Sequence, residues 1–356
     1  MDLDADLPQH LERHLTAFLM EAGAAVRADQ PAFGSGVDTL TEFVLGGGKR
    51  LRPTFAWWAW RGAGGDPAGP DAEGVLQAVA SLELVQACAL IHDDLIDSSD
   101  SRRGRPTVHI SYAREHRANG WLGAPETFGL AAAVLIGDLA LAWADDMFAH
   151  APLPPATLDA ARPAWRAMRT EVLVGQYLDM RTQATGDTSP EAALRVCRLK
   201  TAAYTVQRPL HLGAALAGAD DQRIAKLREF GDDLGVAFQL RDDLLGVFGD
   251  PSVTGKPAGD DLREGKRTLL VALGLQLAED PERHKLIADA IGAELAEDEV
   301  DTVRRTLAEV GAVDAVEERI TALTSTALAA LERADLAEPA ATRLAELAET
   351  ATQRTS

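Results

Sequence analysis

Two apolar helical segments of this chain end in clusters of aspartate, and this combination restricts how the chain can fold. Asp93, Asp94 and Asp97 follow the apolar run ACALI, and Asp242 and Asp243 follow GVAFQL. On an α-helix, positions i, i+1 and i+4 lie within roughly a quarter turn of each other, so each cluster places its carboxylates on one side. Charge at the end of a buried helix is costly unless it is compensated. The sequence therefore predicts compensating positive charge near both helix ends.

Both clusters are followed by cationic residues. Arg102 and Arg103 follow the first cluster, and Lys256, Lys266 and Arg267 follow the second. Carboxylate oxygens suit Mg²⁺, which typically binds one or two carboxylates plus substrate phosphates. Carboxylates and cations in one site indicate a diphosphate substrate whose charge is neutralised by metal ions and by Lys and Arg together.

The chain's other Asp-Asp pairs lack this context. Paired acidic residues in an acidic chain usually lie on solvated helix faces. We expect such faces at Asp145–Asp146, Asp220–Asp221, Asp232–Asp233 and Asp260–Asp261.

The composition of the 356 residues indicates an all-α protein, because helix formers dominate and the residue alternation of strands is scarce. No Ser/Pro-rich linker or fixed repeat divides the chain, so we expect one helical domain over residues 1–356. Its motifs lie at about 46–267, and further helices are expected at about 268–350. A loop is expected at Gly34–Gly36, a polar connection from Ser98 to about Pro125, and helices over Pro190–Gly218 and 222–248.

Charge and cysteine content exclude several classes of partner. A net charge of −20 leaves no basic stripe for nucleic acid and disfavours anionic membrane surfaces. Cys88 and Cys197 are isolated in apolar helical segments, and the acidic N-terminus does not resemble a signal peptide. The apolar stretch from Phe128 is interrupted by Asp138 and is interpreted as a core helix, without stable membrane insertion. We expect a cytoplasmic protein and, from the wide apolar arcs of its helices, a homodimer.

The motifs, in order, resemble those of the trans-isoprenyl diphosphate synthases, also called the polyprenyl synthetase family, from about Gly46 to Arg267. The matching pieces are GGGKRLRP, LIHDDLIDSSDSRRGRPTVH, GQYLD, KT at Lys200–Thr201, FQLRDD and GKPAGDDLREGKRT. The whole sequence is most similar to actinobacterial-type geranylgeranyl diphosphate synthases. This resemblance implies one helical bundle of the isoprenoid synthase type with a central cavity.

The resemblance also implies the reaction, which is a head-to-tail (1′-4) condensation. An allylic diphosphate (dimethylallyl, geranyl or farnesyl) ionises, isopentenyl diphosphate attacks the carbocation, and a proton and inorganic diphosphate are lost. Negative charge that develops on the leaving diphosphate is where metal ions and cations act.

Metal-binding roles follow from position in the motifs. Asp93 and Asp97 resemble direct ligands of two Mg²⁺ ions, with Asp94 supporting them. Asp242 resembles the ligand of a third ion, with Asp243 behind it. The family motif ends in a further aspartate, but here Gly246 takes that place, which puts one supporting contact to the third ion in doubt.

Substrate-binding roles are carried over in the same way. The residues that resemble the allylic diphosphate site are Arg102, Lys200 and Lys256, with Lys266 closing over it. Thr201 and Gln239 match positions near the reacting carbon and its leaving oxygen. The residues that resemble the isopentenyl diphosphate site are Lys49, Arg52, Arg103 and Gln86. Since Gln86 replaces a histidine that is common in the family, we expect a modestly weaker site.

Product length is expected to depend on the helix that leads into Asp93, which in this family forms the wall of the cavity. Cys88 and Ala89, five and four residues before Asp93, are small where a short-chain synthase has an aromatic stop. We then expect the floor to lie deeper, at residues such as Leu84 or Val85 of the same helix, or on a neighbouring helix, where Phe55, Trp57 and Trp58 are candidates by bulk. We expect the twenty-carbon geranylgeranyl diphosphate, and products of twenty-five or more carbons, or farnesyl diphosphate, remain alternatives.

Two rival functions remain at this point. A terpene cyclase shares the aspartate and metal chemistry but needs no second diphosphate site, so GGGKRLRP argues against it. A non-catalytic regulatory subunit is expected to have lost one or both aspartate clusters, and the first cluster is complete here.

Overall fold

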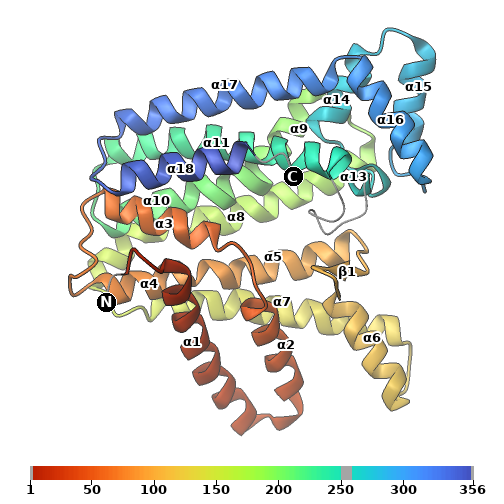
Figure 1. Ribbon diagram of the computed structural model, residues 1–356. Helices are drawn as coiled ribbons and strands as arrows, with labels where there is room; N and C mark the ends of the chain where they lie inside the picture. The colour runs from red at the N-terminus through yellow and green to blue at the C-terminus, as the bar shows by residue number, and fades with distance from the viewer. Residues whose placement is uncertain (1–2, 250–258, 354–356) are drawn as a thin grey trace. The chain divides into compact units, whose positions relative to one another are not determined.

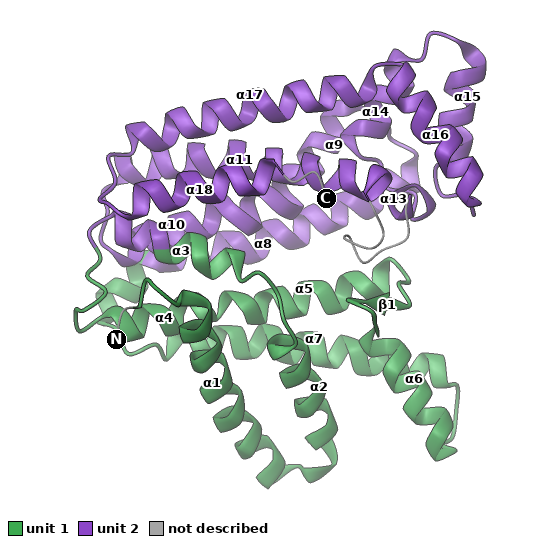
Figure 2. Ribbon diagram, viewed as in Figure 1, with its two compact units in different colours: residues 1–57, 65–160 green, residues 58–64, 161–356 purple. Residues whose placement is uncertain are grey.

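A computed structural model describes residues 3–249 and 259–353 (Figure 1). The described chain is all-α apart from a two-stranded antiparallel ribbon, which confirms the predicted fold class. Contacts divide it into two compact units, Met1–Trp57 with Gly65–Ala160 and Trp58–Gly64 with Ala161–Ser356 (Figure 2). The prediction of one domain over 1–356 stays a prediction.

The first unit is built around the pair α5 and α7, which pack along each other, with α6 against α7. Its elements are α1 (Leu7–Asp29), η1 (Pro31–Phe33), α2 (Gly34–Leu45), the first half of α3 (Leu51–Gly62), α4 (Ala72–Ala80), α5 (Leu82–Ile96), β1 (Ser101–Arg102), β2 (Arg105–Pro106), α6 (Val108–Asn119) and α7 (Pro125–Ala149). Glycine permits the close approach of the central pair. A Cβ added at Gly137 of α7 would lie 2.5 Å from His92 Cδ2 of α5.

The second unit is built around α11, which packs against α17 and against a π-helix, η2. Its elements are most of α8 (Pro155–Thr185), α9 (Pro190–Val196), η2 (Cys197–Gln207), α10 (Arg208–Leu216), α11 (Asp221–Phe248), α13 (Asp260–Arg263), α14 (Leu269–Leu277), α15 (Pro281–Ala290), α16 (Glu297–Glu309), α17 (Ala312–Arg333) and α18 (Ala340–Thr352). Buried residues of α11 recur every three or four positions, as at Leu227, Phe230 and Leu234, which is the spacing of one helix face.

Three local expectations differ from the structure. Gly34–Gly36 was expected in a loop but forms the first turn of α2. The connection after Ser98 contains the β-ribbon and α6. Many of its polar residues belong to this short helix and not to a coil. The expected helix over Pro190–Gly218 is continuous but changes to π-helical hydrogen bonding at η2, a change that hydrophobic spacing does not reveal.

Two helical stretches of the described chain are long and apolar enough to cross a membrane. The stretch Ala72–Ile96 has 78% of its apolar window buried, as expected of core helices. In α7 the corresponding window is 39% buried. Some apolar side chains of α7 are therefore exposed, among them Leu130 and Leu135.

Candidate active site

The first aspartate cluster lies at the C-terminal end of α5. Asp93 and Asp94 belong to its last turn and Asp97 is the C-cap residue. The chain leaves the helix at Ser98, which has φ +53°, and the Ser99 N–H donates to the Asp94 carbonyl oxygen at 2.9 Å. The C-terminal end of a helix carries partial negative charge. Carboxylates placed there need cations to stabilise them.

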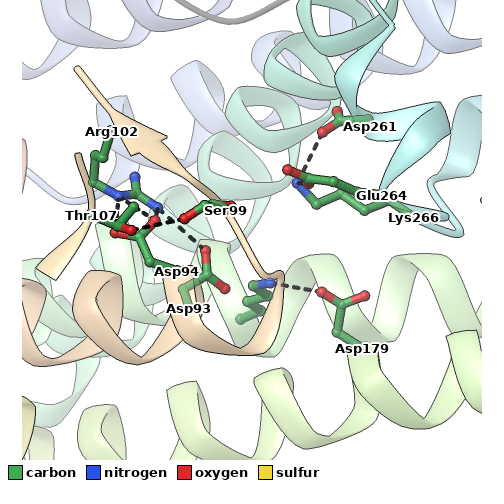
Figure 3. A network of polar contacts seen from close by, with 10 residues as sticks. Asp93, Asp94, Ser99, Arg102, Thr107, Asp179, Asp261, Glu264 and Lys266 are labelled. Carbon is green, nitrogen blue, oxygen red and sulfur yellow. Dashed lines mark hydrogen bonds and ion pairs between the residues drawn. The ribbon is translucent and has the colours of Figure 1, made fainter. Parts of the chain in front are cut away.

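The β-ribbon supplies this cation by turning the chain back onto the cluster (Figure 3). Arg102 Nε on β1 donates to both carboxylate oxygens of Asp94 at 2.8 and 2.9 Å, and its Nη2 lies 3.8 Å from Asp93 Oδ2. Thr107 closes the ribbon by donating from its hydroxyl to the Ser99 carbonyl oxygen at 2.9 Å. Asp94 is 1% exposed, and burial raises its pKa although Arg102 opposes the shift. The structure therefore places predicted Arg102 on the predicted metal-binding aspartates.

The glycine turn before α3 is joined to the same ribbon. Gly47 and Gly48 have φ of +106° and +132°, values open to glycine. Arg103 Nη1 donates to the Gly47 carbonyl oxygen at 2.7 Å. Burial, followed by the nearby charges of Arg102 and Arg50, lowers the pKa of Arg103. The turn that carries predicted Lys49, with predicted Arg52 at the start of α3, is thus a place where cations gather, as an anion site requires.

Arg50, between the two predicted cations, has a structural role instead. Its guanidinium pairs with Glu83 of α5 at 2.6 Å and donates to the Val44 carbonyl oxygen at 2.8 Å. Both side chains of this ion pair are 6% exposed. Gln86 lies three residues after Glu83, on the same side of α5. The ion pair therefore holds the cationic turn beside the helix that carries predicted Gln86.

Two of the three residues predicted to set product length, Cys88 and Ala89, are adjacent in sequence and point about 100° apart around α5. Cys88 Sγ lies 3.7 Å from His92 Nδ1, and His92 Nε2 lies 3.2 Å from the Val134 carbonyl oxygen of α7. Cys88 therefore lies on the side of α5 toward α7. Burial, with a contribution from Asp138, raises the pKa of the Cys88 thiol to about 12. Ala89, one turn before Asp93, shares the face of the aspartate.

Val85 of α5 is buried. As a predicted part of the cavity floor, its role stays a prediction.

In the second unit, predicted Lys200 and Thr201 lie in the π-helix η2. Lys200 Nζ donates to Asp179 Oδ2 of α8 at 2.7 Å. A Cβ added at Gly175 of α8 would lie 2.5 Å from Lys200 Cα, and one added at Gly235 of α11 would lie 2.5 Å from Ala202 Cα. The π-helix is thus pressed against glycines of two neighbouring helices, and π-helical turns are frequent at functional sites.

The second aspartate cluster lies near the C-terminal end of α11. Gln239 Nε2 donates to Asp243 Oδ1 at 2.6 Å, as their spacing of four residues predicts. Asp243 is buried, and its pKa is raised to about 8 by desolvation and then by the charges of Asp261 and Asp242. A Cβ added at Gly246 of the same helix would lie 2.6 Å from Asp261 Cγ. A third carboxylate therefore lies close to the pair.

Lys266 forms ion pairs with this third carboxylate, Asp261, and with Glu264 (Figure 3). Its ammonium group lies 2.9 Å from Asp261 Oδ1 and 2.5 Å from Glu264 Oε2. The Asp261 side chain is 13% exposed, so the expectation of a solvated face is wrong for this residue. The paired lysine compensates for its burial. Predicted Lys256 lies outside the described residues.

Sequence reasoning missed three acidic partners that the structure identifies: Asp179, Asp261 and Glu83. Asp179 ends the quoted motif GQYLD, and that position was available as a signal. Asp261 was set aside as one of several Asp-Asp pairs, although Lys266 follows it by five residues. Nothing in the local sequence connects Glu83 to Arg50.

The donors fit Mg²⁺. No three His, Cys, Asp or Glu side chains form a closed metal cage in the part of the chain that the structure describes. Mg²⁺ does not require such a cage, since it binds through one or two carboxylates plus substrate phosphates and water. Each unit offers clustered carboxylate oxygens with a cation close by, at Asp93 and Asp94 with Arg102 and at Asp243 and Asp261 with Lys266.

Comparison with known proteins gives consistent results. The polyprenyl synthetase profile matches residues 37–310. The chain is 35% identical over 279 residues to a geranylfarnesyl diphosphate synthase of Aeropyrum pernix, covering 78% of this chain and 80% of that one. It is 34% identical over 255 residues to a geranylgeranyl diphosphate synthase of Sulfolobus acidocaldarius, covering 71% and 70%. A crystal structure of Corynebacterium glutamicum geranylgeranyl pyrophosphate synthase, complexed with isoprenyl diphosphate and magnesium, superposes with a TM-score of 0.95 at 47% identity and covers 99% of this chain and 100% of that one.

Proposed function

Since the chain belongs to the polyprenyl synthetase family and is a trans-prenyltransferase, we propose that it condenses isopentenyl diphosphate head-to-tail with allylic diphosphates to give geranylgeranyl diphosphate. The observation that most directly supports this proposal is the contact of Arg102 with Asp94 beside Asp93. It places a guanidinium at carboxylates of the type that Mg²⁺ binds. A guanidinium beside metal-binding carboxylates is suited to bind a diphosphate that carries Mg²⁺ ions.

The proposed ion count is three Mg²⁺ per site. Asp93 and Asp97 would hold two ions with support from Asp94, and Asp242 would hold the third with support from Asp243. When bound, Mg²⁺ neutralises the diphosphate and stabilises the negative charge of the leaving group.

The cations of the chain then divide between two diphosphates. Arg102 and Lys200 bind the allylic diphosphate, joined by Lys256 and by Lys266. The present partners of Arg102, Lys200 and Lys266, which are Asp94, Asp179 and Asp261, fix these three side chains before substrate arrives, which lowers the entropy lost on binding.

The isopentenyl diphosphate would be bound without metal at the glycine turn. Lys49, Arg52 and Arg103 provide positive charge there, and the Gln86 amide provides a neutral donor. Backbone in positive φ at Gly47 and Gly48 permits a phosphate to approach closely.

Reacting groups are proposed for the second unit. The Thr201 hydroxyl and the Gln239 amide would lie near the reacting carbon and the leaving oxygen. Gln239 is oriented by its hydrogen bond to Asp243, so the amide nitrogen is engaged and its carbonyl oxygen is left to face a developing positive charge.

The twenty-carbon product is proposed from the names of the relatives and from the small Ala89 side chain. Ala89 shares the Asp93 face of α5 and leaves room one turn from the metal-binding aspartates. A twenty-five-carbon product is the alternative that the Aeropyrum relative supports.

We further propose a cytoplasmic homodimer, based on the exposed face of α7. Leu130 and Leu135 are 55% and 59% exposed, and Phe128 and Val134 are also exposed. Phe128 and Leu135 share one side of α7 and Leu130 and Val134 share another, and exposed apolar patches usually mark an interface. Light scattering coupled to size exclusion tests this, with Leu135→Glu expected to yield monomer and exposed Arg114→Glu on α6 expected to leave the dimer intact.

The reaction is tested with purified protein, Mg²⁺, labelled isopentenyl diphosphate and each of dimethylallyl, geranyl and farnesyl diphosphate. The dephosphorylated products are then sized. A dominant twenty-carbon alcohol is expected. Longer alcohols would support the proposed condensation but would replace the proposed twenty-carbon product with a longer one. No elongation by folded protein would favour a regulatory subunit or a cyclase.

A further inference from the structure

The helix α13, which precedes Lys266, is too short to be stable without contacts to other elements. It consists of four residues, Asp260–Arg263, and isolated helices shorter than about twelve residues are marginal in water. The Lys266 backbone N–H donates to the Asp261 carbonyl oxygen at 3.0 Å, and its ammonium group pairs with the Asp261 carboxylate. The position of this ammonium group therefore depends on what holds α13 in place.

The loop between α15 and α16 binds α13 through two hydrogen bonds. The Gly292 N–H donates to the Leu262 carbonyl oxygen at 2.7 Å. In the other direction, Arg263 Nε of α13 donates to the Leu295 carbonyl oxygen at 3.0 Å. One bond uses the main chain of α13 and the other uses a side chain. Together they fix α13 on the hairpin of α15 and α16 (residues 281–309).

The same hairpin is anchored to the end of α11 that carries Asp242 and Asp243. Arg304 Nε of α16 donates to the Val247 carbonyl oxygen at 2.5 Å, and its guanidinium carbon lies 6.0 Å from the centre of the Phe248 ring. Both residues belong to the last turn of α11, where the carbonyl groups carry partial negative charge and a cation is stabilising. Arg304 therefore holds the hairpin on the turn that follows the second aspartate cluster.

Apolar packing joins the same three elements. A Cβ added at Gly259, the N-cap residue of α13, would lie 2.7 Å from Val300 Cγ1 of α16. Leu262 of α13, Val247 of α11 and Val303 of α16 belong to one buried apolar cluster. The start of α13 and the end of α11 are thus packed against the same helix, α16.

We propose that Arg263 and Arg304 are positioning residues for the allylic diphosphate, because they hold α13 and the end of α11 on the α15–α16 hairpin and so fix Lys266. The proposal rests on the proposed function, which assigns Lys266 to that diphosphate. Both arginines donate to main-chain carbonyl oxygens of another element, so they act on the path of the backbone and not on the substrate. Isopentenyl diphosphate, whose proposed site lies in the first unit, should be bound as before when they are lost.

The test is steady-state kinetics with farnesyl diphosphate and isopentenyl diphosphate varied separately. Arg263→Met and Arg304→Met keep the apolar stem of the side chain and remove its donors. Each is expected to raise the KM for farnesyl diphosphate about tenfold, because a displaced cation binds the phosphate less well, while the KM for isopentenyl diphosphate stays constant. Arg263→Lys and Arg304→Lys retain a charged donor and should recover part of the loss.

A double-mutant cycle shows whether Arg263 acts through Lys266. Calorimetric titration of inorganic diphosphate into the full-length protein at saturating Mg²⁺ measures the affinity. Arg263→Met should weaken diphosphate binding about tenfold in the wild-type background. It should have little further effect in Lys266→Met, since residues that act as one unit are not additive.

The matched control is Arg283→Met, which removes an exposed ion pair between α15 and Glu309 of α16 and should leave both KM values unchanged. Circular dichroism verifies folding, and where a methionine variant does not fold, the lysine variant is measured in its place. An unchanged KM for farnesyl diphosphate, an equal rise in both KM values, or full additivity with Lys266→Met overturns the proposal. Failure of the proposed function is recognised separately, as wild-type protein that neither elongates substrate nor binds diphosphate with Mg²⁺.

Discussion

The two aspartate clusters differ in how their partners are brought to them. In the first unit, Asp94 and Arg102 are eight residues apart, and one short ribbon joins them. In the second unit, Asp243 is joined by Gln239 of its own helix and approached by Asp261 from the separate helix α13. A cluster built from one continuous segment can be recognised as a motif. A cluster assembled from two segments looks incomplete in either segment alone.

Loss of a metal-binding aspartate from each cluster gives the largest expected effect. Asp93→Ala and Asp242→Ala should each lower turnover on the order of a thousandfold, because charge developing on the leaving diphosphate loses stabilisation. Steady-state assays with farnesyl diphosphate measure this, with circular dichroism to verify folding. Exposed Asp100→Ala should retain activity. Normal turnover in either cluster variant would remove that cluster from the metal site.

Removing the cation that pairs with each acidic cluster should lower the free energy of unfolding by a different amount in the two units. Arg102→Met leaves the nearly inaccessible Asp94 carboxylate without its guanidinium and should reduce the free energy of unfolding by about 3 kcal/mol. Lys266→Met should reduce it less, because Asp261 retains more solvent. Urea denaturation in metal-free buffer measures both. Equal losses would show that the two acidic sites are equally dependent on their cations.

Product length should respond to the first unit through α5. Ala89→Phe places a ring on the Asp93 face and should shift the main product from twenty to fifteen carbons. Cys88→Phe should shorten it less, because Cys88 lies beside His92 toward α7. Chromatography of dephosphorylated products distinguishes the two variants. An unaltered spectrum in Ala89→Phe would place the cavity wall elsewhere.

Lowering the pH is expected to have a smaller effect, a loss of stability that depends on His211 in the second unit. Burial, followed by Arg208, lowers the pKa of His211 from 6.5 to about 4. Its Nδ1 accepts from Arg208 Nη1 at 3.2 Å, so the folded state holds neutral imidazole. The unfolded chain takes up the proton more readily. The stability contribution of His211 is therefore complete above pH 6.5 and is lost as the pH falls toward 4.

His211→Gln is the matched variant for this pH effect. Thermal unfolding measured between pH 7 and 4 should show a shallower fall in Tm for this variant than for the wild type. Parallel curves for the two proteins would assign the acid sensitivity to other groups.

Much of the fold could be predicted from the sequence because helix signals are local. Apolar spacing predicts α5 and α11, and motif order places the two predicted metal-binding aspartate clusters on them. The changes at η2 and at Gly34 escape such reasoning, because α-helical periodicity is assumed throughout a helical segment and a Gly-Ser-Gly run is interpreted as a loop signal.

The contacts of the candidate site that join residues of one continuous motif could be predicted from the sequence. The Arg102–Asp94 pair follows from the order of residues in one segment. The overlap of Asp261 with the space over Gly246 depends on how α13 packs against α11, which no spacing rule describes. The side of α5 on which Cys88 lies likewise depends on which helix packs beside it.

The glycines against η2 limit how this enzyme can be engineered. Substitution at Gly175, Gly231 or Gly235 would bring a new carbon to within 2.6 Å of backbone atoms in η2, and backbone cannot move aside as a flexible side chain does. A combinatorial library aimed at new allylic substrates should hold these three positions constant. Variation is better directed to the side chains of η2 itself, where a change in shape leaves the path of the main chain intact.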